Sequence, residues 1–290
     1  MPFCANSSSS APDHAKADLK KQMAARGVRK AILAFIETHL GMRSPAESEV
    51  LNESVISEAA PPSQQTIEPF YVHTQRELEE IFREMMPAFE GRETEHNWLA
   101  RDKSILKLRR LLKGNAPSDF NAAFLAGIKG MMDGIIKTAN TLRTTMSTNA
   151  CQLVQELYRS LGPALDSVTE IIIQNFIKMS AATKLITGKN ADATMETILS
   201  NCTYNHRLMN HIVLTFQEKN MQTRSFAPSW LKVLMKKNAS HKAHFEHAGG
   251  IELIEKCLKR GLEDATPRVR EMTRSAYWVY AQIWPEHGAR

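Results

Sequence analysis

The sequence predicts an all-α protein that folds as a solenoid of stacked helix pairs, of the HEAT-repeat type, and three observations support this. Glycine and proline number only 13 and 12 among 290 residues, and hydrophobic residues make up 43%, a composition that favours a globular, helical chain. Apolar residues recur at helical spacing from residue 73 onward, and we find no convincing strand. The helices recur in pairs at roughly forty residues, the period of HEAT and armadillo repeats.

The residues before the repeats predict three segments. Residues 1–14 are polar and Ser-rich, which is typical of a disordered tail. Residues 15–41 carry one apolar stripe at helical spacing and end on Gly41, so we expect a single amphipathic helix there. Residues 42–72 are acidic and contain prolines, which predicts a linker. The repeat domain is expected over 73–290.

Five helix pairs are expected in this domain, because one pair cannot bury its apolar faces alone but stacked neighbours can. The first helices of the pairs are expected at 74–86, 118–137, 164–179, 205–219 and 244–261. The second helices are expected at 99–113, 142–161, 191–201, 223–237 and 267–283.

Local features modify this scheme. The third turn, which carries "KLITGKNADAT", is expected to be longer than the others. Pro228 falls early in the second helix of the fourth pair, where a proline bends a helix or delays its start. Trp230, Trp278 and Trp284 lie within helical apolar patterns and are expected to pack in the core, although a missing last repeat would expose Trp284.

The turns within the pairs are the candidate functional site. In a stack of hairpins these turns fall along one edge, so residues far apart in sequence come into line. Basic residues open the second helices, although a cation is slightly unfavourable at a helix N-terminus, and this recurrence indicates function. The edge would carry Trp98, Arg143, Lys184, Lys189, Lys219, Arg224, Arg268 and Arg270.

The net charge indicates the class of partner, and the cysteine usage indicates the compartment. The net charge is +6, and the isoelectric point is about 9.1, which favours an acidic partner such as nucleic acid, anionic lipid or an acidic protein face. No apolar run approaches a membrane span, and no signal core is present. The four cysteines are far apart, so we expect reduced thiols in a cytosolic or nuclear protein.

No enzyme signature is found. The chain offers no Ser–His–Asp or paired-carboxylate arrangement, and "ITGKN" lacks the earlier glycine and the following Ser or Thr of a phosphate-binding loop. His241, His244 and His247 lack the cysteine or carboxylate partners usual in metal sites, so a solvated loop or helix start is expected. We therefore expect no cofactor, no metal and no small-molecule substrate.

The ordered set of turns resembles the TOG domain of the CLASP family, of fungal type. The run "HTQRELEEIFREMMPAFEGRETEHNWLARDKSILKLRRLL" is similar to the first repeat of such a domain, and "TLRTTMSTNACQLVQEL" to its second turn and helix. "EKNMQTR" is similar to the fourth turn and "DATPRVREMTRSAYW" to the fifth. TOG domains commonly have a sixth pair, where five are found here, and the helix at 15–41 resembles an extra helix that CLASP domains can carry.

The resemblance implies a non-enzymatic module that binds the αβ-tubulin heterodimer or microtubule through these turns. It implies microtubule stabilisation, by promoted rescue and suppressed catastrophe, in the cytoplasm, cytoskeleton, mitotic spindle, kinetochore and nucleus. Trp98 would be the first-turn anchor. The full implied tubulin-binding set is Trp98, Arg101, Arg143, Lys184, Lys189, Lys219, Asn220, Arg224, Arg268 and Arg270.

Two alternative functions remain open at this point. One is a HEAT-repeat scaffold for another acidic protein. The other is a basic solenoid that binds nucleic acid, which the sequence disfavours because it lacks the interleaved aromatic residues of single-strand binders.

Overall fold

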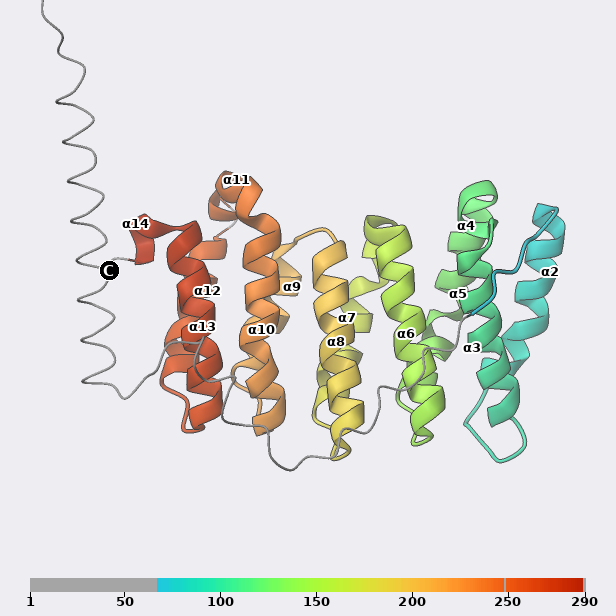
Figure 1. The fold of residues 1–290 in the computed structure, drawn as a ribbon, viewed down its shortest axis with the longest axis horizontal. Coiled ribbons are helices and arrows are strands. Elements are labelled where there is room, and N and C mark those ends of the chain that lie inside the picture. The colour runs from blue at the N-terminus through green and yellow to red at the C-terminus, as the bar shows by residue number, and fades with distance from the viewer. Residues whose placement is uncertain (1–66, 248, 289–290) are drawn as a thin grey trace, which may run out of the picture. The chain divides into compact units, whose positions relative to one another are not determined.

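The computed structural model describes residues 67–247 and 249–288, and these form the five expected helix pairs (Figure 1). The first helices are α2 (Gln75–Met85), α5 (Asn121–Ala139), α7 (Asp166–Ser180), α9 (His206–Thr215) and α12 (Gly250–Leu262). The second helices are α3 (Trp98–Lys113), α6 (Thr144–Leu161), α8 (Leu185–Asn201), α10 (Met221–Asn238) and α13 (Pro267–Ile283). Short elements join them: η1 (Met86–Phe89), α4 (Ala116–Asp119), η2 (Gly162–Leu165), η3 (Ala239–His241), α11 (Lys242–His247) and α14 (Pro285–Gly288).

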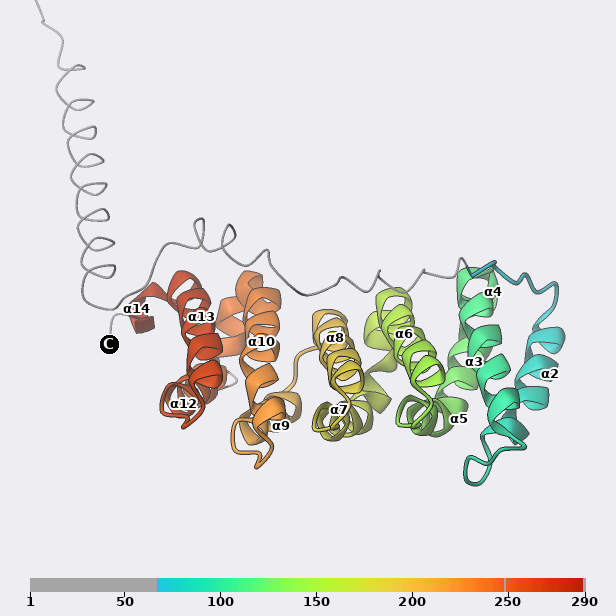
Figure 2. The ribbon, with the colours of Figure 1, turned by 60° about the horizontal axis from the view of Figure 1, so that its bottom comes forward.

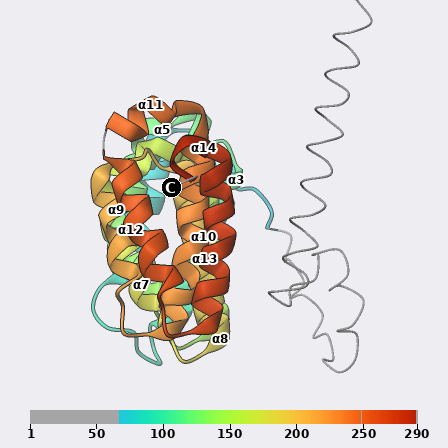
Figure 3. The same cartoon turned by 90° about the vertical axis from the view of Figure 1, so that its left-hand side faces the viewer.

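The helices of the repeat unit stand in two layers. The second helices form one layer and the first helices the other, as the turned and end-on views show (Figures 2 and 3). Leu108, Ile135 and Leu157 are among the fully buried residues that fill the space between helices. This arrangement confirms the predicted all-α repeat solenoid. Within the described ranges, no helix is long and apolar enough to cross a membrane.

Several helix starts follow from capping residues in the sequence. Thr74 accepts a hydrogen bond from the backbone N–H of Glu77 and caps α2. Asn205 and Asn220 cap α9 and α10 in the same way, at 3.0 and 3.1 Å. Each side-chain oxygen satisfies a donor that the first turn of a helix would otherwise leave unpaired.

Four local expectations are wrong. Helix α8 begins at Leu185, so the third turn is short rather than long. Gly188 lies inside α8, and a Cβ there would lie 2.0 Å from Nε2 of Gln222, so this glycine permits close helix packing. Helix α10 begins at Met221 and contains Pro228, which therefore does not delay its start. The first helix of the last pair is divided into α11 and α12.

The fourth correction concerns a tryptophan. Trp230 and Trp284 are fully buried, as expected, but Trp278 on α13 is 61% exposed. The expected tail, N-terminal helix and most of the linker lie outside the described residues.

The end of the expected linker is attached to the solenoid. The backbone N–H of Phe70 donates to the carbonyl of Arg110 at 2.9 Å, and Asn115 bonds both the N–H and the carbonyl of Val72. A Cβ at Gly114 would lie 1.8 Å from the carbonyl oxygen of Phe70. Glycine at this position therefore lets the incoming segment run directly against α3.

Polar bonds tie neighbouring second helices together. The guanidinium of Arg109 on α3 forms a two-pronged bond to Glu156 on α6, at 2.8 and 2.9 Å. The indole N–H of Trp230 on α10 donates to Asp192 on α8 at 2.8 Å. Burial raises the pKa of Asp192 to about 6, although the bond from Trp230 opposes this shift.

Asp192→Asn provides a pH test of this contact. A raised folded-state pKa stabilises the protein below the ordinary value of 3.8, and that stabilisation is lost as pH rises through about 6. The asparagine retains an acceptor for Trp230 and carries no charge. We therefore expect the variant to gain stability relative to wild type more at about pH 7 than at about pH 4, measured by urea unfolding. An equal difference at both pH values would contradict this account.

Two glycines on α5 provide a matched packing test. A Cβ at Gly127 would lie 2.4 Å from the buried ring of Phe82, whereas a Cβ at Gly130 would meet only the end of Met86, at 3.5 Å. Gly127→Ala should therefore lower the free energy of unfolding by about 1–3 kcal/mol. Gly130→Ala should raise it by up to about 1 kcal/mol, because alanine favours helix. Thermal unfolding of both variants measures the difference, and equal effects would exclude close α2–α5 packing.

Candidate functional site

The five turns within the pairs lie at one end of the helices, along the lower edge in Figure 1. They span 90–97, 140–143, 181–184, 216–220 and 263–266. We call this edge, with the residues that open the second helices, the turn ridge. Its existence confirms the sequence-based expectation that the turns come into line.

Trp98 opens α3 and is held in place by the second turn. The guanidinium carbon of Arg143 lies 4.5 Å from the centre of the indole ring, a cation–π contact. The same guanidinium pairs with Glu95 at 2.7 Å and with Glu93 at 3.2 Å. The positive charge of Arg143 is therefore compensated within the ridge. Its role in the structure is to cover one face of Trp98, which is half-buried.

Arginines at the fourth helical position cap their own turns. Arg101 donates to three backbone carbonyls, each at 2.9 Å. Arg224 donates to two carbonyls of the fourth turn at 2.8 and 2.9 Å, and Arg270 to two of the fifth turn at 2.7 and 2.9 Å. Charge-assisted bonds of this kind satisfy carbonyls left unpaired where the first helix ends. The recurrence of basic residues at these positions is therefore structural.

Arg101 is consequently a correction to the predicted contact set, because its side chain is only 2% exposed. The corresponding residue of the second pair is Ser147, whose hydroxyl donates to the carbonyl of Ala139 at 2.6 Å. In the third pair the position is Gly188, and Gln222 of the next pair donates to the carbonyl of Ser180 at 2.8 Å. The cap of the third turn thus joins two repeats.

Arg224 also joins the fourth turn to the fifth. Its Nε lies 2.7 Å from the Asp264 carboxylate, and the two side chains are 17% and 7% exposed. Asp264 accepts a second bond from the N–H of Thr266 at 2.8 Å. Although burial opposes it, these bonds hold the pKa of Asp264 below its ordinary value. The guanidinium of Arg224 therefore stabilises the fold and is not available to a partner.

The exposed cations of the predicted set lie in the third to fifth turns of the ridge, and Arg92 of the first turn, which the prediction did not include, is also exposed. Lys184 is exposed, and its ammonium donates to the carbonyl of Leu142 at 3.0 Å. Lys189, Lys219 and Arg268 are exposed and form no side-chain hydrogen bond with any described residue. The structure thus brings together a smaller set of available cations than the sequence predicted.

Asn220 contributes mainly to the backbone of the fourth turn. It caps α10 and also lies within 3.4 Å of the carbonyl of Ala181, so its amide is already occupied on the ridge.

Sequence analysis missed a row of exposed apolar side chains on the same edge. Leu142 is 84% exposed, more than any other large apolar residue described. The row consists of Leu99, Leu142, Leu185, Ile186 and Met221. A signal was present, since each stands beside the polar turn and outside the buried stripe of its helix. The ridge is therefore apolar as well as basic.

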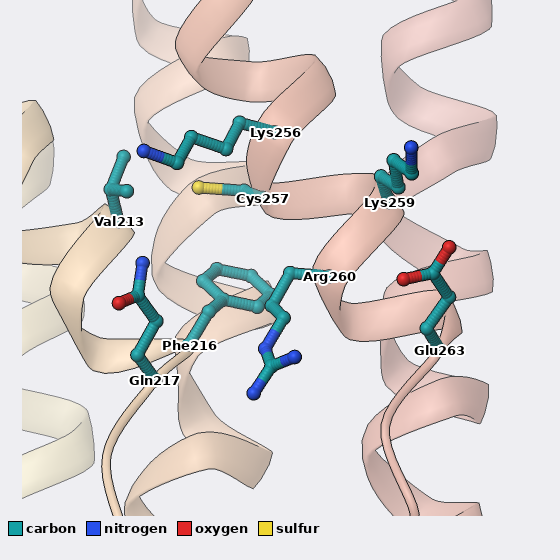
Figure 4. Close-up of a pocket in the computed structure, with 8 residues that line it drawn as sticks. All are labelled: Val213, Phe216, Gln217, Lys256, Cys257, Lys259, Arg260 and Glu263. Atoms are coloured by element: carbon teal, nitrogen blue, oxygen red, sulfur yellow. The ribbon is translucent and has the colours of Figure 1, made fainter.

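A hollow of about 190 Å³ lies between α9 and α12, and Phe216, Gln217 and Glu263 of its lining belong to the fourth and fifth turns (Figure 4). Phe216 and Cys257 point into it, whereas Lys256 and Arg260 point in different directions and do not converge (Figure 4). Burial raises the pKa of Cys257 to about 12, so the thiol is not an activated nucleophile. Among the described residues, no group of three His, Cys, Asp or Glu side chains could hold a metal ion.

Comparisons with known proteins point to one family. The family model described as "CLASP N terminal" matches residues 78–290. Protein STU1 of Chaetomium globosum is 49% identical over 275 residues, which is 95% of this chain and 24% of that protein. Protein STU1 of Phaeosphaeria nodorum is 47% identical over 96% of this chain and 24% of that protein. The chain therefore spans about a quarter of the length of these relatives.

The solved structures that resemble the chain are more distant. A computationally designed armadillo repeat protein gives a TM-score of 0.39 at 13% identity, covering 71% of this chain and 91% of the designed protein.

The two cations of the fourth turn should differ in their effect on stability. Arg224→Ala leaves Asp264 without its partner and two carbonyls without donors, so we expect a loss of about 2–4 kcal/mol in the free energy of unfolding. Lys219→Ala is the matched control, and its effect should stay within about 0.5 kcal/mol. Urea unfolding measures both. Equal stability of the two variants would refute the structural role of Arg224.

Proposed function

Because the chain belongs to the CLASP N-terminal family, we propose that it is a non-enzymatic, microtubule-associated module that binds tubulin through the turn ridge. One observation carries the proposal: the cation–π contact with Arg143 holds Trp98 in place at one end of an exposed row of apolar side chains. Rigid aromatic anchors surrounded by apolar contacts are typical of the energetic centres of protein interfaces.

The distribution of charge along the turn ridge indicates which kind of partner surface each end of the ridge would meet. Around the first and second turns, Arg143 is already neutralised by Glu93 and Glu95. Exposed cations occur farther along, at Lys219 and Arg268. We propose that a partner meets the first end with apolar surface and the other end with acidic surface. The cationic end would then speed association and make it sensitive to salt.

Binding of this kind can alter microtubule stability without chemistry. A rigid ridge that fits one tubulin conformation better than another shifts the equilibrium toward that conformation, by as much as its two affinities differ. Promotion of rescue and suppression of catastrophe are the proposed outcomes, in the cytoplasm and on the mitotic spindle. A scaffold for another acidic protein would use the same ridge. The ridge is less suited to binding nucleic acid, because Arg143 already covers one face of Trp98, the only tryptophan of the ridge, and so blocks that face from stacking on a base.

Leu142→Asp tests the proposal without disturbing the fold, because Leu142 is 84% exposed. We expect it to weaken binding to purified αβ-tubulin or microtubules about tenfold or more. Lys219→Ala with Arg268→Ala should weaken binding less and flatten its salt dependence, since these cations lie in no internal pair. Co-migration on sizing and co-sedimentation, at low and moderate salt, measure both.

Arg159→Ala is the control, since it removes an exposed cation at the opposite end of α6. Wild-type affinity in both ridge variants would refute the ridge as the site. Failure of the wild type to bind tubulin and microtubules would refute the function itself, and ridge-dependent capture of nucleic acid would favour that alternative.

A further inference from the structure

A larger hollow lies between α2 and α5, two neighbours in the layer of first helices. Its volume is about 530 Å³, and pockets that bind ligands commonly measure ~300–1,000 Å³. Its walls belong to the first and second pairs, so it lies between two adjacent repeats and is not an end face of the stack. Neither the packing of the fold nor the turn ridge accounts for it.

Small residues on α5 leave this hollow open. Ala126 and Gly127 form part of its floor. The ring of Phe82 packs against Gly127, where a Cβ would lie 2.4 Å away, but one turn later a Cβ at Gly130 would meet only the end of Met86, at 3.5 Å. Met86 is itself 45% exposed, although methionine is among the residues most often buried. Apolar surface is therefore left uncovered between the two helices.

The rim of the hollow is acidic, on a chain whose net charge is +6. Its charged lining residues are Glu79, Arg83 and Glu90. The guanidinium of Arg83 pairs with Glu80, so its charge is compensated on α2. Glu79 accepts a bond from the neutral amide of Gln75 at 2.7 Å. Neither Glu79 nor Glu90 forms a salt bridge with any residue that the structure describes, so both carboxylates are available to a cation.

The two carboxylates stand at opposite ends of the wall formed by α2 and η1. Glu90 follows Glu79 by eleven residues, which is roughly 16 Å at 1.5 Å per residue of helix. An extended peptide covers that distance in roughly five residues. We call the surface made by Glu79, Phe82, Met86, Ala126 and Glu90 the α2–α5 groove. It meets the turn ridge only at Glu90, and the remainder runs along the layer of first helices.

We propose that the α2–α5 groove is a second docking surface, which takes a basic peptide segment with apolar side chains between two cations. The apolar side chains pack on Met86 and Ala126, and the cations pair with Glu79 and Glu90. Charge complementarity selects a basic occupant. The same carboxylates repel the phosphates of nucleic acid and the headgroups of an anionic membrane. A flexible methionine in the wall can adapt to apolar side chains of different shape.

The test uses the whole chain and a labelled synthetic peptide in which two lysines, five residues apart, flank leucines. Fluorescence anisotropy measures its binding. Ala126→Lys places a long side chain and a like charge in the groove, so we expect binding to weaken about tenfold or more. Ala122→Lys is the matched control, because it adds the same side chain one turn earlier on α5, outside the groove. Both alanines are exposed, so the unfolding transitions of both variants should match wild type.

The carboxylates are tested separately from the apolar floor. Glu79→Gln with Glu90→Gln should weaken peptide binding severalfold and reduce its salt dependence. Glu84→Gln removes an exposed carboxylate of α2 that does not line the groove, and it should bind as wild type does. A peptide with glutamates in place of the lysines should not bind. A peptide with the lysines but without the leucines should bind more weakly.

A ridge variant separates this surface from the proposed tubulin contact. Leu142→Asp should leave peptide binding unchanged, so the result is independent of whether the ridge binds tubulin. Absence of binding by the wild type, unchanged affinity in Ala126→Lys, or loss of binding in Leu142→Asp would overturn the proposal. A dimer of the chain on sizing that Ala126→Lys abolishes would overturn it in favour of a second copy as the occupant.

Discussion

The capping of the backbone carbonyls in the turn that precedes each second helix is the constraint on which the rest of the structure depends. A solenoid turn ends one helix and begins another within a few residues, so it concentrates unpaired carbonyls at one edge. Arg101, Arg224 and Arg270 satisfy these groups within their own turns. Gln222 does so for the neighbouring turn. Because the caps fix each turn and link some of them, the edge can present side chains in a set geometry.

The turn ridge contains two kinds of basic residue that the sequence alone does not distinguish. Arg143 and Arg224 are held by carboxylates and contribute to shape. Lys219 and Arg268 are exposed and contribute to the electric field that an approaching partner meets. Net charge alone therefore overstates how basic the ridge is. The exposed apolar row, with Leu142 as its most exposed member, adds the contact area that charge by itself cannot provide.

The fold was largely predictable, and the errors have local causes. The stretch "KLITGKNADAT" suggested a long third turn, but α8 includes all of it after Lys184, and the missing side chain at Gly188 makes room there for Gln222. Trp278 fitted a helical apolar pattern, yet its place between two buried residues turns it outward. Periodicity measures spacing along one helix. It cannot register which neighbour, if any, faces a given side chain.

The sequence by itself determined the all-α class, the five pairs, most helix limits and the alignment of the turns, because 3.6-residue periodicity, capping residues and a repeat of roughly forty residues are local properties. Only the tertiary structure decided which cations remain available, that Arg101 is buried and that Leu142 and Trp278 are exposed. These outcomes depend on hydrogen bonds and packing between residues in different turns and helices, such as Arg143 with Glu95 and Arg224 with Asp264. Partners of that kind meet only when the chain has folded.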